Sequence, residues 1–273
     1  MEVTLTTRNL IGDFTWSTNL NASINRNEIT NLDKQVIEDG FLNRAIEGKP
    51  IGAFFGREYA GVDPANGDAL YYLNTKKADG SLDRTKSNDY SAAERVFIGD
   101  PNPNWTAGVT NTFGYKGIDL NFTFQGVFGN EVYNGGGKFM SANAGGGFDN
   151  LTRDQLTRWQ KPGDITNVPR AVLFDIYGTG GSGESSRFLS DGSYVRLKTV
   201  SLGYSLPTSI AKLGRLQSAR IYLSAVNLLT FTDYDGWDPE VNADYLSSNI
   251  AQGNDFYSAP QAKTYTLGVN IGF

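Results

Sequence analysis

The sequence contains no cysteine and no histidine. Without cysteine there is neither a disulfide framework nor a thiolate metal site. Without histidine, a Ser-His-Asp triad, a Cys-His pair, a histidine zinc site and histidine acid–base catalysis are all excluded. Carboxylate pairs of the glycosidase type stay open, but no spacing in the sequence places two Asp or Glu residues together. We therefore predict no catalytic residues, no metal, no cofactor and no enzyme activity.

The sequence is also poor in charge and has no long apolar run. Charged residues make up 19% and the net charge is −5, so we expect no basic face and no nucleic-acid partner. Residues 1–30 lack a basic start followed by an apolar block of roughly 7–15 residues, and no stretch approaches the ~20 apolar residues of a spanning helix. Taken alone, this favours a soluble protein, unless strands cross the membrane or Met1 is not the true start.

What the sequence does contain is the period-two alternation typical of β-strands. Phe14, Trp16, Leu20, Ala22 and Ile24 fall on one face, and small or polar residues fall on the other. Similar alternation predicts seven long strands, at residues 2–8, 14–26, 105–115, 118–128, 194–206, 219–229 and 264–273.

The strand expected at 194–206 changes phase part-way along. Val195 and Leu197 share one face, whereas Val200 and Leu202 have the opposite parity. One extra residue would return all four to the same face, so we predict a β-bulge at 198–199.

The connections between these strands alternate strictly between short and long. Short ones lie at 9–13, 116–117 and 207–217, and long ones at 27–103, 130–193 and 230–262. In an up-and-down sheet, this order places all short connections at one edge, which is the plan of an outer-membrane barrel. The strand count is odd, whether or not two further strands at 52–61 and 69–72 are included, so the first and last strands cannot close a ring. The predicted fold is all-β: an antiparallel, up-and-down transmembrane β-barrel segment with long extracellular loops and short periplasmic turns, incomplete as a barrel.

The long connections carry weaker signals. A short helix is expected at 150–160 and a flexible Gly/Ser-rich loop at 177–186. Residues 178–183 match the dinucleotide fingerprint GxGxxG, but that motif must follow a strand and open a helix, and neither is expected here. The flexible loop is the favoured interpretation.

Charged and aromatic residues in these regions have ordinary explanations. Arg196 and Lys198 are expected to be solvated charges on a barrel wall, and Trp159, Tyr234 and Trp237 to pack their loops, although aromatics there can also stack on sugars. Turns account for most of the clustered oxygen ligands, which lack the EF-hand pattern. A calcium site in an outer loop stays open at either of two clusters: Asp63, Asn66 and Asp68, or Asp235, Asp238, Glu240 and Asp244.

Several stretches together carry a family resemblance. They read GKPIGAFFG (48–56), YAGVDP (59–64), GDPNPNW (99–105), GVFGNEVYN (126–134), RFLSDGSYVRLKTVSLGYSLP (187–207) and VNLLTFTDYDGWDPEV (226–241). In this order they resemble the C-terminal barrel region of the SusC/RagA family of TonB-dependent outer-membrane transporters from Bacteroidetes, over nearly the whole chain.

The resemblance implies that residues 1–273 are the C-terminal part of such a barrel, without signal peptide, plug domain and N-terminal barrel strands. It implies import of a nutrient, a glycan or oligosaccharide or a peptide, in the outer membrane of a Gram-negative bacterium. The implied partners are membrane lipid, a SusD-like lipoprotein and TonB acting through the missing N-terminal part. It carries over no substrate-binding residue. The alternative is a small self-contained β-barrel or sandwich that binds a ligand or a partner protein.

The last strand has a role under this interpretation. Its alternating residues and final aromatic resemble the signal read by the outer-membrane assembly machinery, and comprise Tyr265, Leu267, Val269, Ile271 and Phe273. The barrel hypothesis also predicts which side chains face lipid, namely Phe14, Trp16, Phe122, Phe124, Leu223 and Phe273. Those predicted to face the lumen are Asn19, Asn21, Asn121, Gln125 and Arg196.

Overall fold

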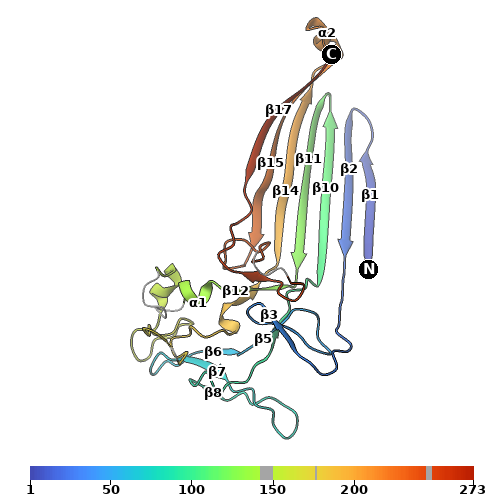
Figure 1. Cartoon of the computed structure of the whole chain (residues 1–273). Helices are drawn as coiled ribbons and strands as arrows, with labels where there is room; N and C mark the ends of the chain where they lie inside the picture. The colour runs from blue at the N-terminus through green and yellow to red at the C-terminus, as the bar shows by residue number, and fades with distance from the viewer. Residues whose placement is uncertain (142–149, 176, 244–247) are drawn as a thin grey trace.

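The computed structural model describes residues 1–141, 150–175, 177–243 and 248–273. Seven long strands form one antiparallel sheet in the order β1-β2-β10-β11-β14-β15-β17 (Figure 1). Every long strand predicted from the alternation is present: β1 (Glu2–Leu10), β2 (Phe14–Ser23), β10 (Trp105–Tyr115), β11 (Ile118–Phe128), β14 (Tyr194–Ser205), β15 (Ser218–Thr232) and β17 (Thr264–Gly272). Among the described residues, no helix has the length and apolar character needed to cross a bilayer.

The register of the sheet places most apolar residues of the seven strands on one face. One row of neighbouring side chains across six strands reads Trp16, Phe113, Leu120, Leu202, Leu223 and Leu267. The adjacent row, which points to the opposite face, reads Ser17, Thr112, Asn121, Ser201, Ser224 and Thr266. Since a one-residue slip would exchange the two faces, this pattern specifies the register strongly.

The predicted β-bulge is present and keeps β14 in phase. The pairing of β14 steps from Leu197 to Thr199 against both β11 and β15, which leaves Lys198 without a partner in either register. Leu197 and Val200 therefore lie on the same apolar face, paired with Phe124 and Phe122.

Short connections gather at one end of the sheet (Figure 1). The hairpin between β10 and β11 turns on Lys116 and Gly117, with φ of 45° and 84°, and positive φ at both positions fits the right-handed strand twist. A side chain on Gly117 would lie 2.6 Å from the carbonyl oxygen of Ser205. The third connection holds a helix that the sequence did not predict, α2 (Thr208–Leu213).

The long connections fold into a layer of small sheets at the other end (Figure 1). Buried Leu42, Phe54, Tyr133 and Phe188 form its larger core cluster. The strands of the first sheet are β3 (Ile37–Asp39), β4 (Asn43–Ala45), β5 (Ala53–Gly56) and β9 (Val96–Gly99); of the second, β6 (Tyr59–Val62), β7 (Ala69–Tyr72) and β8 (Lys86–Ser87); of the third, β12 (Glu131–Asn134), β13 (Leu189–Asp191) and β16 (Asn254–Asp255).

Three predictions for this layer need correction. The stretch 52–61 is divided between β5 and β6, which belong to different sheets. The helix expected at 150–160 is a 3₁₀ helix at Arg153–Thr157, and a four-residue helix α1 (Gly137–Met140) precedes it. The loop at 177–186 is packed, because Gly178 accepts a hydrogen bond from the Tyr71 hydroxyl at 2.8 Å and Ser185 is fully buried. A single 3₁₀ turn, Ser186–Phe188, follows it in place of the helix that a dinucleotide site requires.

Candidate functional site

A cavity of about 990 Å³ lies where the three long connections meet. Each connection contributes side chains to its wall: Tyr59 and Tyr72 from the first, Asn134 and Arg187 from the second, and Trp237 and Tyr257 from the third. Its volume falls in the range of roughly 300–1,000 Å³ usual for ligand sites, so we take this loop cavity as the candidate functional site.

Two aromatic rings that line the loop cavity are exposed. Trp237 is 62% exposed and Tyr257 is 46% exposed although both line it. The prediction that Trp237 packs its loop is therefore wrong. The same prediction is confirmed for Trp159 and Tyr234. The Trp159 indole donates to the Pro64 carbonyl at 3.1 Å, and Tyr234 is buried.

Arg187 is the partly buried cation of this wall, which also holds the exposed Arg153, and it was not singled out from the sequence. Its Nη1 donates to the Gly181 carbonyl at 2.6 Å and its Nη2 to the Ser141 carbonyl at 2.7 Å. Burial lowers the pKa of the Arg187 guanidinium, partly offset by nearby tyrosines and carboxylates, yet arginine stays charged in proteins. The wall thus presents a fixed positive charge.

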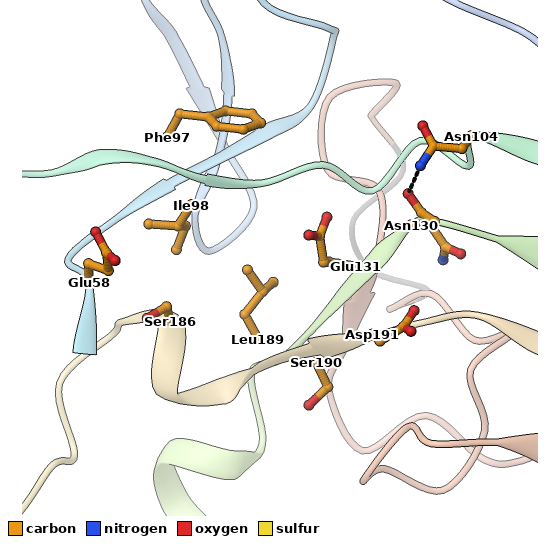
Figure 2. Close-up of a pocket in the computed structure, with 11 residues that line it drawn as sticks. Glu58, Phe97, Ile98, Asn104, Asn130, Glu131, Ser186, Leu189, Ser190 and Asp191 are labelled. Atoms are coloured by element: carbon orange, nitrogen blue, oxygen red, sulfur yellow. Dashed lines mark hydrogen bonds between the residues drawn. The ribbon is translucent and has the colours of Figure 1, made fainter. Parts of the chain in front are cut away.

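A second cavity, of about 710 Å³, lies between β9 and β13. In Figure 2, Phe97 and Ile98 lie on one side of it and Leu189 to Asp191 on the other, with Glu131 between them. Strand pairing sets Glu131 directly opposite Asp191. Burial raises the pKa of Glu131, and the charges of Asp100 and Asp191 add to this against a hydrogen bond from the Asp100 amide. Sequence spacing could not reveal this carboxylate pair, since its members lie in distant segments.

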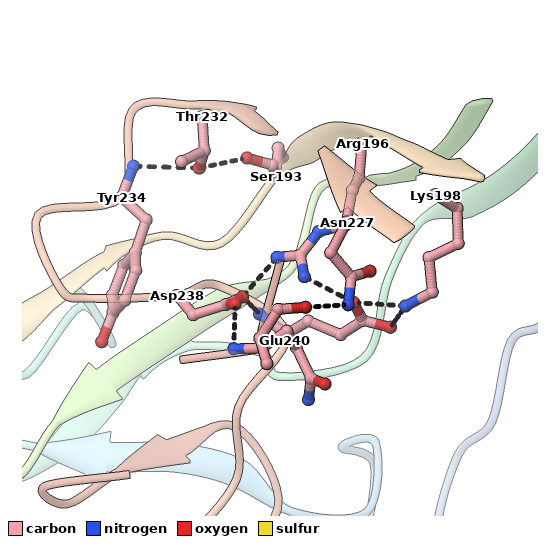
Figure 3. Close-up of polar contacts among 10 residues, drawn as sticks. Ser193, Arg196, Lys198, Asn227, Thr232, Tyr234, Asp238 and Glu240 are labelled. Atoms are coloured by element: carbon pink, nitrogen blue, oxygen red, sulfur yellow. Dashed lines mark hydrogen bonds and ion pairs between the residues drawn. The ribbon is translucent and has the colours of Figure 1, made fainter. Parts of the chain in front are cut away.

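Arg196 ties the third long connection to the wall (Figure 3). The side chain is 1% exposed, and its Nη2 lies 2.5 Å from Asp238 Oδ1 and its Nη1 3.2 Å from Glu240 Oε2. Lys198 Nζ reaches both oxygens of Glu240 at 2.8 Å. Asp238 also accepts from the amides of Glu240 and Gln261 at 2.9 Å. The prediction that Arg196 is a solvated wall charge is wrong, because the loop between β15 and β17 covers and pairs it.

These contacts argue against a calcium site at either cluster. Asp238 and Glu240 are engaged by Arg196 and Lys198, and Asp244 lies outside the described residues. In the other cluster, Asp68 is bound by Arg170 at 2.7 Å. The remaining members form turn contacts, as expected from the sequence: Asp63 to the amide of Ala65, and Asn66 to Asp68. No group of three or more Asp or Glu residues in the described ranges is arranged to hold a metal ion.

The residues predicted to face lipid or lumen separate as expected between the two faces of the sheet. Asn21, Gln125 and Arg196 lie in one row of the polar face. Phe14, Trp16, Phe122, Phe124 and Leu223 lie on the opposite, mainly apolar face, where the row of Phe122 also holds Thr18 and Asn111. In and beyond β17, the residues proposed as an assembly signal are each at least half exposed: Tyr265, Leu267, Val269, Ile271 and Phe273. Their role in assembly stays a prediction.

The comparisons with known proteins agree with this geometry. No protein-family model matches the chain. TonB-dependent receptor P3 of Formosa agariphila is 37% identical over the whole chain, which spans 28% of that protein. The structure of the RagAB peptide transporter matches the whole chain with a TM-score of 0.80 and 28% identity, over 28% of its own chain. The chain belongs to the SusC/RagA family of TonB-dependent receptors. SusC of Bacteroides thetaiotaomicron is 24% identical over 96% of this TonB-dependent receptor chain, and the matched region is 25% of the length of SusC.

Family membership accounts for the fold and for the class of protein. The antiparallel sheet is the fold that the RagAB structure shares over this chain. The relatives are named as receptors and transporters, in agreement with the prediction that the protein is not an enzyme. The TonB-dependent receptor chain spans little more than a quarter of the curated relatives that it matches.

Proposed function

We propose that residues 1–273 form the C-terminal part of the barrel wall of an outer-membrane TonB-dependent importer. The observation that carries the proposal is the two-faced sheet, with mostly apolar side chains on one face of the seven strands and mostly polar ones on the other. A wall between lipid and a polar lumen requires this arrangement.

The open edges of the sheet support the same proposal. In the described ranges, β1 pairs only with β2 and β17 pairs only with β15. Unpaired strand edges are costly in a bilayer because their N–H and C=O groups find no water. The rest of a longer barrel would cover both edges. A small self-contained barrel would pair β1 with β17, which this sheet does not do, and this disfavours that alternative.

The cargo is a glycan or oligosaccharide, or a peptide. A SusD-like lipoprotein works with the transporter in its uptake. The loop cavity supports an oligomeric cargo, because exposed aromatic rings such as Trp237 stack on sugar rings and on flat peptide groups. TonB would act through the part of the transporter outside this chain. The location would be the outer membrane of a Gram-negative bacterium of the Bacteroidetes.

The test is uptake by cells that carry the complete transporter. We expect deletion of its gene to abolish growth on one class of oligomer, either glycan or peptide, and deletion of TonB to have the same effect. Trp237→Ala should weaken uptake of that oligomer at limiting concentration, with the protein still present in the outer membrane. Unchanged uptake of every oligomer in the gene deletion, or a monodisperse complete protein obtained without detergent, would overturn the proposal.

A further inference from the structure

Arg187, like Arg57 and Arg158, is partly buried and has no ion pair among the described residues, but of these three only Arg187 lines the loop cavity. Five arginines have a carboxylate within ion-pair distance: Arg44, Arg84, Arg170, Arg196 and Arg220. Within the described residues, Arg187 has none, and its guanidinium is held by the carbonyl oxygens of Gly181 and Ser141. Neutral carbonyls orient the cation without neutralising it, and an uncompensated charge in a buried site is unfavourable.

The orientation leaves donors for a ligand. A guanidinium has five N–H donors in a planar fork, and the two carbonyl groups engage one on each terminal nitrogen. The side chain lines the loop cavity and is part-exposed to it. Carboxylate, sulfate and phosphate groups match this fork better than they match an ammonium group.

Carboxylates on the same wall do not fill this role. Asp154 accepts hydrogen bonds from Thr152 and Gln155. Asp255 accepts from the Tyr234 hydroxyl at 2.8 Å and from the Ser258 amide at 3.3 Å. Both are engaged by their own donors. Neither of them, nor Asp235, which also lines the cavity, lies within ion-pair distance of Arg187.

We propose that Arg187 is the anion-binding point of the loop cavity, and that it takes an acidic group carried by an oligomeric cargo. The assignment rests on the proposed import function and names the chemistry of the cargo. The acidic group has two sources, the C-terminal carboxylate of a peptide or the carboxylate of an acidic glycan. The aromatic rings around it, Trp237 and Tyr257, receive the uncharged remainder of the oligomer.

The test uses the complete transporter with its partner lipoprotein, purified in detergent and studied by calorimetry. Four probes are titrated: a pentapeptide with a free C-terminal carboxylate, the same peptide as its amide, an oligogalacturonate tetramer, and its full methyl ester. We expect at least one acid to bind about 10- to 100-fold more tightly than its neutral counterpart, which is the factor a charge-assisted hydrogen bond carries. The pair that discriminates identifies the source.

Variants assign this preference to Arg187. Arg187→Gln should reduce binding of the acid to that of the neutral probe. Arg95→Gln removes the same charge from an exposed position outside the cavity wall and should leave the preference intact. Where Arg187→Gln fails to reach the membrane, Arg187→Lys serves, because it keeps the charge but loses the fork and should lower the preference severalfold.

The outcomes separate the two proposals. Equal binding of each acid and its neutral counterpart, or a preference that survives Arg187→Gln, overturns the assignment of Arg187 and leaves import standing. Absence of binding by all four probes, together with unchanged uptake in the gene deletion, overturns the import function and the assignment with it.

Discussion

The ion pair between Arg196 and Asp238 gives the sharpest prediction about stability. Asp238→Asn keeps the shape of the side chain and removes its charge, which leaves Arg196 at 1% exposure with Glu240 at 3.2 Å as its remaining carboxylate. Removing one partner of a buried pair costs about 3–5 kcal/mol. Because Glu240 compensates in part, we take the lower bound of about 3 kcal/mol, which is about 150-fold in the equilibrium for undocking residues 233–263.

Hydrogen exchange of backbone amides in the complete transporter measures this undocking. The amides of Glu240 and Gln261 both donate to Asp238 at 2.9 Å, so they report the event directly. Their exchange should accelerate about 100-fold in Asp238→Asn, while amides of β14 stay protected. The control is Lys77→Gln, which removes an exposed pair at 3.8 Å worth under about 1 kcal/mol. Acceleration below tenfold, or equal acceleration in β14, would refute the reasoning.

The pH dependence of the same contact follows from its pKa. Burial alone would raise the pKa of Asp238, but hydrogen bonds from Arg196 and from the Glu240 and Gln261 amides outweigh it and lower that pKa. A lowered folded-state pKa means that the stabilisation is present above the unfolded value of about 3.9. Protection of the loop should therefore persist from neutral pH to about pH 4 and be lost as the pH falls through the folded pKa.

Three further predictions concern single positions. Because the pKa of Glu131 is raised in the folded state, its ionised form costs stability above that pKa, so protection of β12 amides should rise as the pH falls from neutral. In Glu131→Gln, protection of the β12 amides should be high at neutral pH and should not rise further as the pH falls. A pH dependence of this variant equal to that of the unmodified protein would contradict this explanation. A side chain on Gly268 would meet the Tyr222 ring at 2.3 Å, so Gly268→Val should lower the temperature of heat-induced unfolding on gels, by a destabilisation of about 1–3 kcal/mol. Gly12→Ala, with nothing within 4 Å of the new Cβ, is its control and should leave that temperature unchanged. Phe273→Ala should reduce the fraction of transporter recovered in the outer membrane if the last strand is an assembly signal, and full recovery would exclude that role.

The wall was predictable from the sequence because its signal is local. Strand alternation fixes which side chains share a face, and the change of phase around Lys198 located the bulge without any partner strand. The loop layer was not predictable in the same way. Arg196 lies at a strand position whose side chain points to the lumen side of the wall. Nothing nearby in the sequence shows that a distant loop would cover it and pair it with Asp238. Arg187 and the pairing of Glu131 with Asp191 likewise depend on segments that meet only in the fold.

The small sheets of the loop layer have a consequence for how the long strands come to pair. The β10–β11 hairpin closes over two residues, whereas β2 meets β10 across roughly 80 residues, and the entropic cost of closing a loop rises with its length. Non-local strand pairing of this kind is slow. However, β12 and β13 pair immediately beyond the ends of β11 and β14, and the Arg26 side chain bonds to Asn104 at the ends of the first long connection. Once these contacts form, they bring the ends of the long connections together, so the loop layer lowers the entropic cost of pairing the distant strands of the wall.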